Sequence, residues 1–289
     1  MTPLRDRTLA AVSHLWECSL AENLRRISAW ELPIRQVGLL FYERETSLGY
    51  APEEFSNLVG LSAHAHLPMD LPWEAGAKAV WDIICRLMEK PSACGATGFL
   101  SSGKEDEPCM RECAPLAHDR NTGRNLTRPE GKKTECQLWG GVLHPPAEPR
   151  LLAGVAGLWR KAGPGWRLMV ENIPSQDLRV HWPVIRDMDL PVCLDVGHLM
   201  AFGQEWLLDE PGLPGRVELV HCYAPGRARG VHVHLPLSEL TGAQAVTVRR
   251  ILDMAPATAP ILFEIFSYAH LLDSLERFYQ LDAGGENRK

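Results

Sequence analysis

Histidine, aspartate and glutamate recur at the ends of apolar segments along this 289-residue chain. These residue types supply the nitrogen and oxygen ligands that zinc, manganese and iron accept in proteins. Any one of them alone is more often a hydrogen-bonded structural residue than a ligand, so the argument for chemistry depends on their repetition. The candidate metal ligands, in chain order, are His66, His144, Glu171, Asp195, His198, His221, His232, His234 and Glu264.

The apolar segments that carry these residues have the length and composition of buried β-strands. Amphipathic stretches typical of helices lie between them, among them 21–30, 74–90, 148–161 and 244–254. Regular alternation of strand and helix indicates parallel strands joined by right-handed crossovers. We predict strands at 9–13, 37–42, 61–66, 138–143, 167–171, 192–195, 217–221 and 261–266.

Eight strand–helix units predict an α/β fold of the (β/α)8, or TIM, barrel type, with residues 1–289 forming a single domain. An open, doubly wound sheet is the alternative. In a barrel the carboxyl ends of all strands meet at one mouth, so the candidate ligands become neighbours in space. Unpaired carboxylates and imidazoles in an apolar mouth are costly, and divalent cations remove that cost. We therefore expect a cluster of divalent metal ions, zinc first, with manganese or iron as alternatives.

The stretch from 91 to 137 breaks this alternation, because it is rich in Gly, Ser, Pro and charge and has no clear periodicity. We interpret it as a flexible or small inserted segment between the third helix and the fourth strand. Such a connection belongs to the N-terminal face of a barrel, opposite the chemistry. Its cysteines, Cys94, Cys109, Cys113 and Cys136, could form a zinc knuckle, but they lack a paired C-x2-C spacing, which favours unpaired thiols.

Charge and composition restrict the partners that we expect. The formal net charge is −6, from 30 Lys and Arg against 36 Asp and Glu, whereas proteins that grip nucleic-acid backbones usually carry a basic surplus. We therefore expect no nucleic-acid partner. No apolar run approaches the roughly 18 residues of a membrane span, and the start of the chain lacks the features of a signal peptide. With no dense disulfide framework, a reduced cytoplasmic protein without a membrane partner is the simplest interpretation.

The other histidines are assigned on their position relative to the strands. His64 lies two residues before His66, so its side chain points to the same side of the strand, one layer deeper. Its role as a ligand is therefore less secure than that of His66. His118 falls in the inserted segment, while His181 and His270 follow no strand, and we expect all three at the surface.

Aromatic and basic side chains near the strand ends are candidates for substrate contact. They either line an open mouth or pack between strand and helix in the ordinary way. The aromatic candidates are Trp16, Trp73, Tyr223, Phe266 and Tyr268. Arg227 and Arg229, after the seventh strand, either pair with a phosphate group or lie in a solvated turn.

These strand-end motifs resemble the xylose isomerase-like barrel superfamily, and the ligand pattern resembles that of endonuclease IV, a three-metal enzyme. The resemblance implies one metal at His66, His144 and Glu171, and a second at Glu171, Asp195, His221 and Glu264, with Glu171 bridging the two. A third would be held by His198, His232 and His234. The family has Asp-x-His where this chain has His232-Val233-His234. The change implies a third metal that either binds weakly or is a different ion, and two or three ions per chain.

The residues between the ligands resemble those of the cobamide-remodelling phosphodiesterases. The segments are HLPMDLPW, VENI, CLDVGHLM, VHCYAPG, VHLPLSEL and FEIFS. The resemblance implies hydrolysis of the nucleotide loop of a cobamide such as adenosylcobalamin, which releases a cobinamide phosphate and the riboside of the lower base. Glu171, Asp195 and Glu264 would be the catalytic carboxylates. Trp16, Trp73, Tyr223 and Arg227 would contact this small-molecule substrate.

Three other functions are compatible with the sequence. A sugar or inositol-derivative isomerase or epimerase shares the barrel but usually keeps a single metal. An apurinic endonuclease would nick abasic duplex DNA, for which the chain lacks basic character. A catalytically silent cobamide-binding or metal-sensing protein would bind the corrinoid without releasing the lower base. We expect the phosphodiesterase ahead of these, as a metal-dependent hydrolase.

Overall fold

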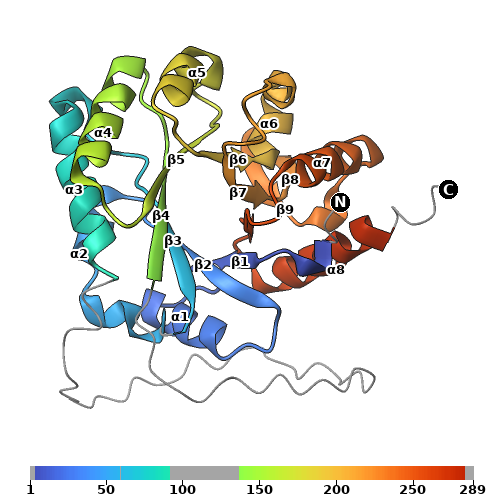
Figure 1. Ribbon diagram of the computed structural model, residues 1–289. Helices are drawn as coiled ribbons and strands as arrows, with labels where there is room; N and C mark the ends of the chain where they lie inside the picture. Colours follow the sequence, from blue (N-terminus) through green and yellow to red (C-terminus); the bar gives the residue numbers. More distant parts are fainter. Residues whose placement is uncertain (1–3, 59, 92–136, 284–289) are drawn as a thin grey trace.

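The computed structural model describes residues 4–58, 60–91 and 137–283 (Figure 1). Its parallel strands form a closed barrel in the order β1-β10-β7-β6-β5-β4-β3-β2, in which β1 (Leu9–Val12) pairs with β10 (Ile261–Phe263). The other barrel strands are β2 (Ile34–Leu40), β3 (Ser62–His66), β4 (Gln137–Leu143), β5 (Arg167–Glu171), β6 (Val192–Asp195) and β7 (Val217–Cys222). The predicted (β/α)8 barrel is confirmed, and the open sheet is excluded because the first and last strands pair.

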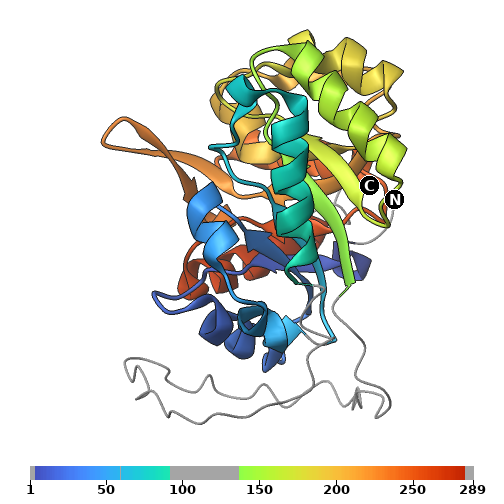
Figure 2. The same cartoon turned by 90° about the vertical axis from the view of Figure 1, so that its left-hand side faces the viewer.

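Helices follow the strands and pack around the outside of the barrel. They are α1 (Leu20–Ser28), α2 (Arg44–Gly49), α3 (Ala77–Glu89), α4 (Pro149–Ala162), α5 (Leu178–Asp187), α6 (Val196–Ala201), α7 (Gly242–Met254) and α8 (Tyr268–Ala283). Helix α3 illustrates why they lie there, since Val80, Ile84 and Leu87 recur at helical spacing and are all buried. Figure 2 shows α3 and α4 side by side against the barrel.

Two boundaries differ from the sequence prediction in ways that matter for the site. The strand expected at 261–266 ends at Phe263, so Glu264 lies just beyond β10. The helix expected at 74–90 is divided at Gly76, whose positive φ of 90° ends a short 3-10 turn (Trp73–Ala75) before α3 begins. Glycine is favoured there because it adopts this backbone conformation without a steric penalty.

The segment after β7 forms a β-hairpin. Strands β8 (Ala224–Ala228) and β9 (Val231–Leu235) pair antiparallel, joined by Arg229 and Gly230 with φ of 51° and 82°. Positive φ at both central residues is the geometry of a tight hairpin turn. The hairpin projects from the barrel, as the orange loop in Figure 2 shows.

Arg7 ties the start of the chain to the end of α7. Its buried guanidinium donates hydrogen bonds to the carbonyl oxygens of Leu252 (2.5 Å), Ala255 (2.9 Å) and Pro256. These bonds satisfy carbonyl groups that a helix leaves without partners at its C-terminal end. The contact therefore holds the segment before β1 against the end of α7, the helix that precedes β10.

Of the predicted insertion at 91–137, the structure describes only the first and last residues, Pro91 and Gln137. Its cysteines, Cys94, Cys109, Cys113 and Cys136, lie outside the described residues. Helix α3 ends at Glu89 and β4 begins at Gln137, so the segment leaves an outer helix and enters a strand at its N-terminal end. In the part of the chain that the structure describes, no helix combines the length and apolar character needed to cross a membrane.

Candidate metal centre

Six barrel strands bring a candidate ligand to the C-terminal mouth. His66, Glu171 and Asp195 are the last residues of β3, β5 and β6. His221 lies in β7, paired in register with Asp195, while His144 and Glu264 follow β4 and β10 directly. Because parallel barrel strands end on one face, these side chains meet although they are separated by about 200 residues of sequence.

Glu171 lies at the centre of this group and is fully buried. Its Oε2 atom is 3.0 Å from Nε2 of His66 and 2.9 Å from Nε2 of His144. Its Oε1 atom is 2.8 Å from Nδ1 of His221. Both carboxylate oxygens therefore contact imidazole nitrogens, which come from three different strands. This is the placement required of a carboxylate that bridges two ions.

Two sets of side chains around Glu171 have ligand atoms within 4.8 Å of one another. One is His66, Glu171 and His221, and the other is Glu171, Asp195, His221 and Glu264. His144 belongs to neither set by this spacing, although its contact with Glu171 keeps it beside the first. The two sets share Glu171 and His221, so they form one continuous centre rather than two separate sites.

A third set consists of His198, His232 and His234, from α6 and β9. Nδ1 of His198 is 3.1 Å from the carbonyl oxygen of Asn172, and Nδ1 of His234 is 2.9 Å from that of Glu264. A nitrogen that donates to a carbonyl carries the proton, which leaves Nε2 of both rings with a lone pair for an ion. Through Asn172 and Glu264 this set is joined to the first two.

Buried polar atoms test whether these residues fit metal ions. Several have no hydrogen-bond partner among the described residues, even though other ligand atoms lie close to them. They are His144 Nε2, Glu171 Oε1, Asp195 Oδ2, His221 Nδ1 and Glu264 Oε2. Short contacts without hydrogen-bond alignment are expected of side chains that point at a shared cation, and buried charges without one are costly. The donor set therefore fits divalent metal.

The pKa values of the carboxyl groups reflect their crowding. Burial, with the nearby charges of Glu171 and Glu264, raises the pKa of Asp195 to about 7. Burial opposes ionisation of the other two as well, but attraction to His221 holds the pKa of Glu264 at about 2 and that of Glu171 well below its usual value. Three buried carboxyl groups around one histidine make a pocket that attracts cations.

Two histidines of the third set have lowered pKa values. Burial and the neighbouring rings of His198 and His234 lower the pKa of His232 to about 4. Burial also lowers the pKa of His234. Neutral imidazole is the form that binds a metal, so these two rings are in the ligating state near neutral pH.

Tyr223 does not line an open mouth, contrary to the expectation from sequence. It is fully buried, and its ring stacks on His234 with centroids 3.7 Å apart. Its hydroxyl is 3.0 Å from Nε2 of His232, so Tyr223 contacts two histidines of the third set and helps to fix their rings. A β-carbon at Gly197 would overlap the Tyr223 ring, which explains why a glycine follows Asp195 and Val196.

The remaining substrate-contact candidates fall in mixed environments. Trp16 is half-buried and stacks on Tyr268 with centroids 5.3 Å apart. Trp73 is half-buried against the core. Phe266 is exposed, with its ring 5.2 Å from that of His234. Arg227 is exposed on β8, directly opposite His232 in the hairpin, and Arg229 is exposed in the turn.

The expectation of a surface position was wrong for His181. This residue is buried on α5, and its Nε2 is 2.7 Å from the carbonyl oxygen of Pro146. Leu178, His181, Trp182 and Ile185 are the buried residues of α5. Their spacing is that of one helical face, a signal that was present in the sequence. His270 is exposed on α8, as expected, and His118 lies outside the described residues.

Asn172, Tyr42, Met69 and Phe202 were not anticipated from the sequence, whereas Phe266 was. Asn172, next to Glu171, is fully buried and bonds to the strand that carries Asp195. Exposed apolar side chains also follow the elements that end at this face, and we call four of them the apolar rim. They are Tyr42, Met69, Phe202 and Phe266. Each follows a strand or a helix at the C-terminal face, and Phe202 lies 5.3 Å from the His232 ring.

The chain matches no known protein-family model, and no curated protein sequence is significantly similar to it. Solved structures with the same fold do exist. A xylose isomerase-like TIM barrel protein from Mycobacterium smegmatis, crystallised with magnesium, has a TM-score of 0.57 at 14% identity, covering 98% of this chain and 99% of that one.

A sugar phosphate isomerase/epimerase from Parabacteroides distasonis has a TM-score of 0.54 at 10% identity, with 96% and 94% of the two chains covered. A probable 3-DHS dehydratase, AsbF, from Bacillus anthracis has a TM-score of 0.52 at 10% identity, with 98% and 100% covered. At such low identity these likenesses show the fold, and they extend over nearly the whole of each chain.

Proposed function

We propose that this protein is a metal-dependent phosphodiesterase. One observation carries the proposal: Glu171 and His221 belong to two ligand sets at once, and a third set adjoins them. Ligands shared between sets suit ions a few ångströms apart, which is the arrangement that many phosphatases and nucleases use. The protein from Mycobacterium smegmatis that shares this fold was crystallised with magnesium, in keeping with a divalent ion in such a barrel.

The ligand assignment implied by the sequence is our proposal for the centre. His66 and His144 would hold one ion, and Asp195, His221 and Glu264 another, with Glu171 between them; His198, His232 and His234 would hold a third. Zinc suits this mixture of imidazole and carboxylate. Divalent ions held there would supply Lewis-acid chemistry, polarising a phosphoryl oxygen and making a nucleophile available from water near neutral pH.

The protein's own charges make substrate binding depend on metal. A phosphodiester is an anion, and Glu171, Asp195 and Glu264 are buried carboxyl groups that would repel it. The anion binds only when cations compensate these groups. Arg227, which pairs with His232 across the hairpin, would bind an exposed phosphate oxygen.

We infer further that the phosphodiester belongs to the nucleotide loop of a cobamide. The sequence segments between the ligands support this, because they resemble those of cobamide-remodelling enzymes. The apolar rim supports it too: the rings of Tyr42 and Phe266 lie 6.2 Å apart, Phe266 lies beside His234, and Phe202 lies beside His232. A corrin ring is broad and flat and needs apolar walls of this kind, whereas a sugar phosphate does not.

The test is to incubate zinc-loaded protein with adenosylcobalamin and to separate the products by chromatography. We expect cobinamide phosphate and the lower-base riboside in equal amounts, two or three bound metal ions per chain, and no products after chelation. One ion per chain with isomerisation of a sugar substrate would replace the proposal by an isomerase. Corrinoid binding without cleavage would indicate a silent binder, and nicking of abasic duplex DNA an endonuclease.

A further inference from the structure

His14, which follows β1, is a histidine at the mouth that the ligand sets do not use. Its place follows from the sheet register, in which Ala10 of β1 pairs with Leu262 of β10. Side chains two residues apart along a strand point to the same side of the sheet. Glu264 lies two residues beyond Leu262, and His14 lies four beyond Ala10. His14 therefore shares the side of Glu264 and lies one layer further towards the mouth.

A series of ring contacts connects His14 to the metal centre. The His14 ring packs edge-on against Tyr42 with centroids 6.2 Å apart, and Tyr42 lies at the same distance from Phe266. Phe266 in turn lies 5.2 Å from the ring of His234, a residue of the third ligand set. His14, Tyr42 and Phe266 thus form a layer against the metal centre, and a molecule bound to ions there would extend into this layer.

Ser13 determines which nitrogen of the His14 ring carries the proton. Ser13 is fully buried and extends the strand ladder, since its N–H donates to the carbonyl oxygen of Gly38 at 2.8 Å. Its Oγ accepts the N–H of Leu40 at 3.1 Å and lies 2.9 Å from Nδ1 of His14. Among the described residues no other acceptor bonds the Ser13 hydroxyl, so this hydroxyl donates to Nδ1. A neutral imidazole then holds its one proton on Nε2.

The Nε2–H group of His14 is free to bind a ligand. The residue is half-buried, and within the described part of the chain its Nε2 makes no hydrogen bond. Nε2 is also not one of the buried polar atoms that lack a partner, so it is in contact with solvent. Burial lowers the pKa of His14, so the ring is neutral near neutral pH. The side chain therefore offers a hydrogen-bond donor without a charge.

We propose that His14 is a substrate-binding residue, which donates a hydrogen bond from Nε2 to an oxygen of the phosphodiester. The inference rests on the proposed function, because ions in the centre would hold the phosphate beside this layer. A phosphate oxygen carries negative charge, and hydrogen bonds to charged groups are stronger than those between neutral groups. A neutral donor also orients the diester without adding a positive charge that would compete with the metal ions for the carboxylates.

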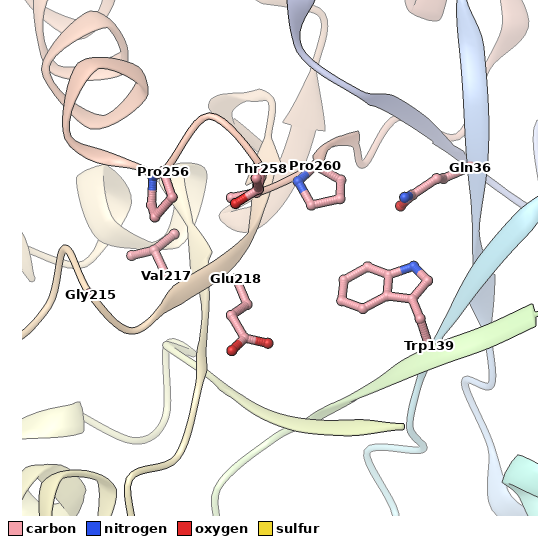
Figure 3. Close-up of a pocket in the computed structure, with 9 residues that line it drawn as sticks. Gln36, Trp139, Gly215, Val217, Glu218, Pro256, Thr258 and Pro260 are labelled. Carbon is pink, nitrogen blue, oxygen red and sulfur yellow. The ribbon is translucent and has the colours of Figure 1, made fainter. Parts of the chain in front are cut away.

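The pocket at the N-terminal ends of the strands is a poor site for the same anion. It has a volume of about 380 Å³, and Gln36, Trp139 and Glu218 help to line it (Figure 3). Glu218 is the charged residue of the lining, and its Oε2 accepts a hydrogen bond from Nε of Arg167 at 2.9 Å. The carboxylate repels an anion and already pairs with the nearby guanidinium. We therefore expect phosphate at the mouth and not in this pocket.

Calorimetric titration of the zinc-loaded full chain with inorganic phosphate tests the proposal without turnover. His14→Leu should weaken phosphate binding about 10–100-fold, which is the contribution of a hydrogen bond to a charged group. Its zinc content should stay at the wild-type value, because His14 belongs to no ligand set among the described residues. His14→Gln, whose amide N–H reaches the position of Nε2, should recover most of the affinity. His270→Leu, at an exposed histidine of α8, is the control and should bind phosphate like the wild type.

If His14→Leu does not fold, His14→Asn replaces it, because the shorter amide does not reach the position of Nε2. Nitrogen-15 NMR of histidine-labelled protein should show the proton of His14 on Nε2. A proton on Nδ1, wild-type phosphate affinity in the folded variant, or loss of zinc from that variant would overturn the proposal. Wild-type protein that cleaves no phosphodiester, yet binds phosphate more tightly than His14→Leu does, would instead refute the proposed function and leave His14 as an anion-binding residue.

Discussion

The side-chain amide of Asn172 forms two hydrogen bonds with the backbone of Asp195. Nδ2 donates to the Asp195 carbonyl oxygen at 2.9 Å, and Oδ1 accepts the Asp195 N–H at 2.8 Å. The carbonyl oxygen of Asn172 also lies 3.1 Å from Nδ1 of His198. One residue thus fixes the end of β6 and the ring of His198, and so positions ligands of two different sets.

Asn172→Ala should therefore weaken metal binding although Asn172 is not itself a proposed ligand. Groups that orient metal ligands typically contribute about 10–100-fold to affinity or activity. We expect a loss of this size in metal affinity, with a destabilisation of about 1–3 kcal/mol because buried backbone groups lose their partners. Metal titration and denaturant unfolding measure the two effects.

Asn57→Ala is the control, since Asn57 also bonds a backbone carbonyl, that of Ala21 at 3.3 Å, on the α1 side of the barrel. It should leave metal affinity unchanged. Equal metal affinity in Asn172→Ala and the wild type would show that Asn172 holds the fold and not the metal ligands.

Glu171 should be the least replaceable residue of the centre. Its two oxygens contact His66, His144 and His221. Gln cannot replace this carboxylate, because its side chain is uncharged and because the amide nitrogen that takes the place of one oxygen repels a cation. Glu171→Gln should lose metal and activity together, by more than the 10–100-fold expected of a group that only orients a ligand. Metal content and turnover of the purified variant test this.

His234→Ala provides the comparison, because His234 belongs to the third set alone. It should keep at least part of the bound metal. If Glu171→Gln instead keeps full metal content and near-normal turnover, the bridging role is wrong and a single-metal isomerase becomes the better explanation.

The apolar rim should distinguish a large substrate from a small one. The double variant Tyr42→Ala, Phe266→Ala removes two exposed rings whose centroids are 6.2 Å apart. Burying one such ring contributes roughly 1.5–3 kcal/mol, so KM for adenosylcobalamin should rise at least about tenfold. Turnover of bis(p-nitrophenyl) phosphate, which is too small to need the rim, should stay close to wild type.

Val246 is an exposed apolar residue on α7, and Val246→Ala should change the kinetics of neither substrate. If the double variant lost activity equally towards both phosphodiesters, Tyr42 and Phe266 would support the metal centre and would not recognise the corrin.

The inserted segment should be dispensable for chemistry. It joins the end of α3 to the N-terminal end of β4, so its attachment points lie away from the mouth. Replacing residues 92–135 with a short Gly/Ser linker should preserve turnover, with an equal or lower Tm. Loss of turnover in a folded deletion variant with an unchanged circular dichroism spectrum would show that the segment reaches the centre.

The sequence alone was enough to predict the barrel and the positions of its metal-ligand candidates. Strand and helix periodicities are local, and parallel strands must end on one face, so His66, Glu171 and Asp195 could be placed at the same level without coordinates. What a local pattern does not specify is which side chains meet across strands. The bond of Asn172 to Asp195 joins residues 23 apart, and the contact of His66 with Glu171 joins residues 105 apart.

Only the tertiary structure decided the surroundings of the site. Tyr223 follows a strand just as a mouth residue would, yet it is buried because Gly197 of α6 leaves room for its ring beside His234. His181 follows no strand, yet it is buried because α5 turns that face towards the carbonyl of Pro146. Burial of a side chain depends on the packing of elements distant in sequence, and local composition does not encode that packing.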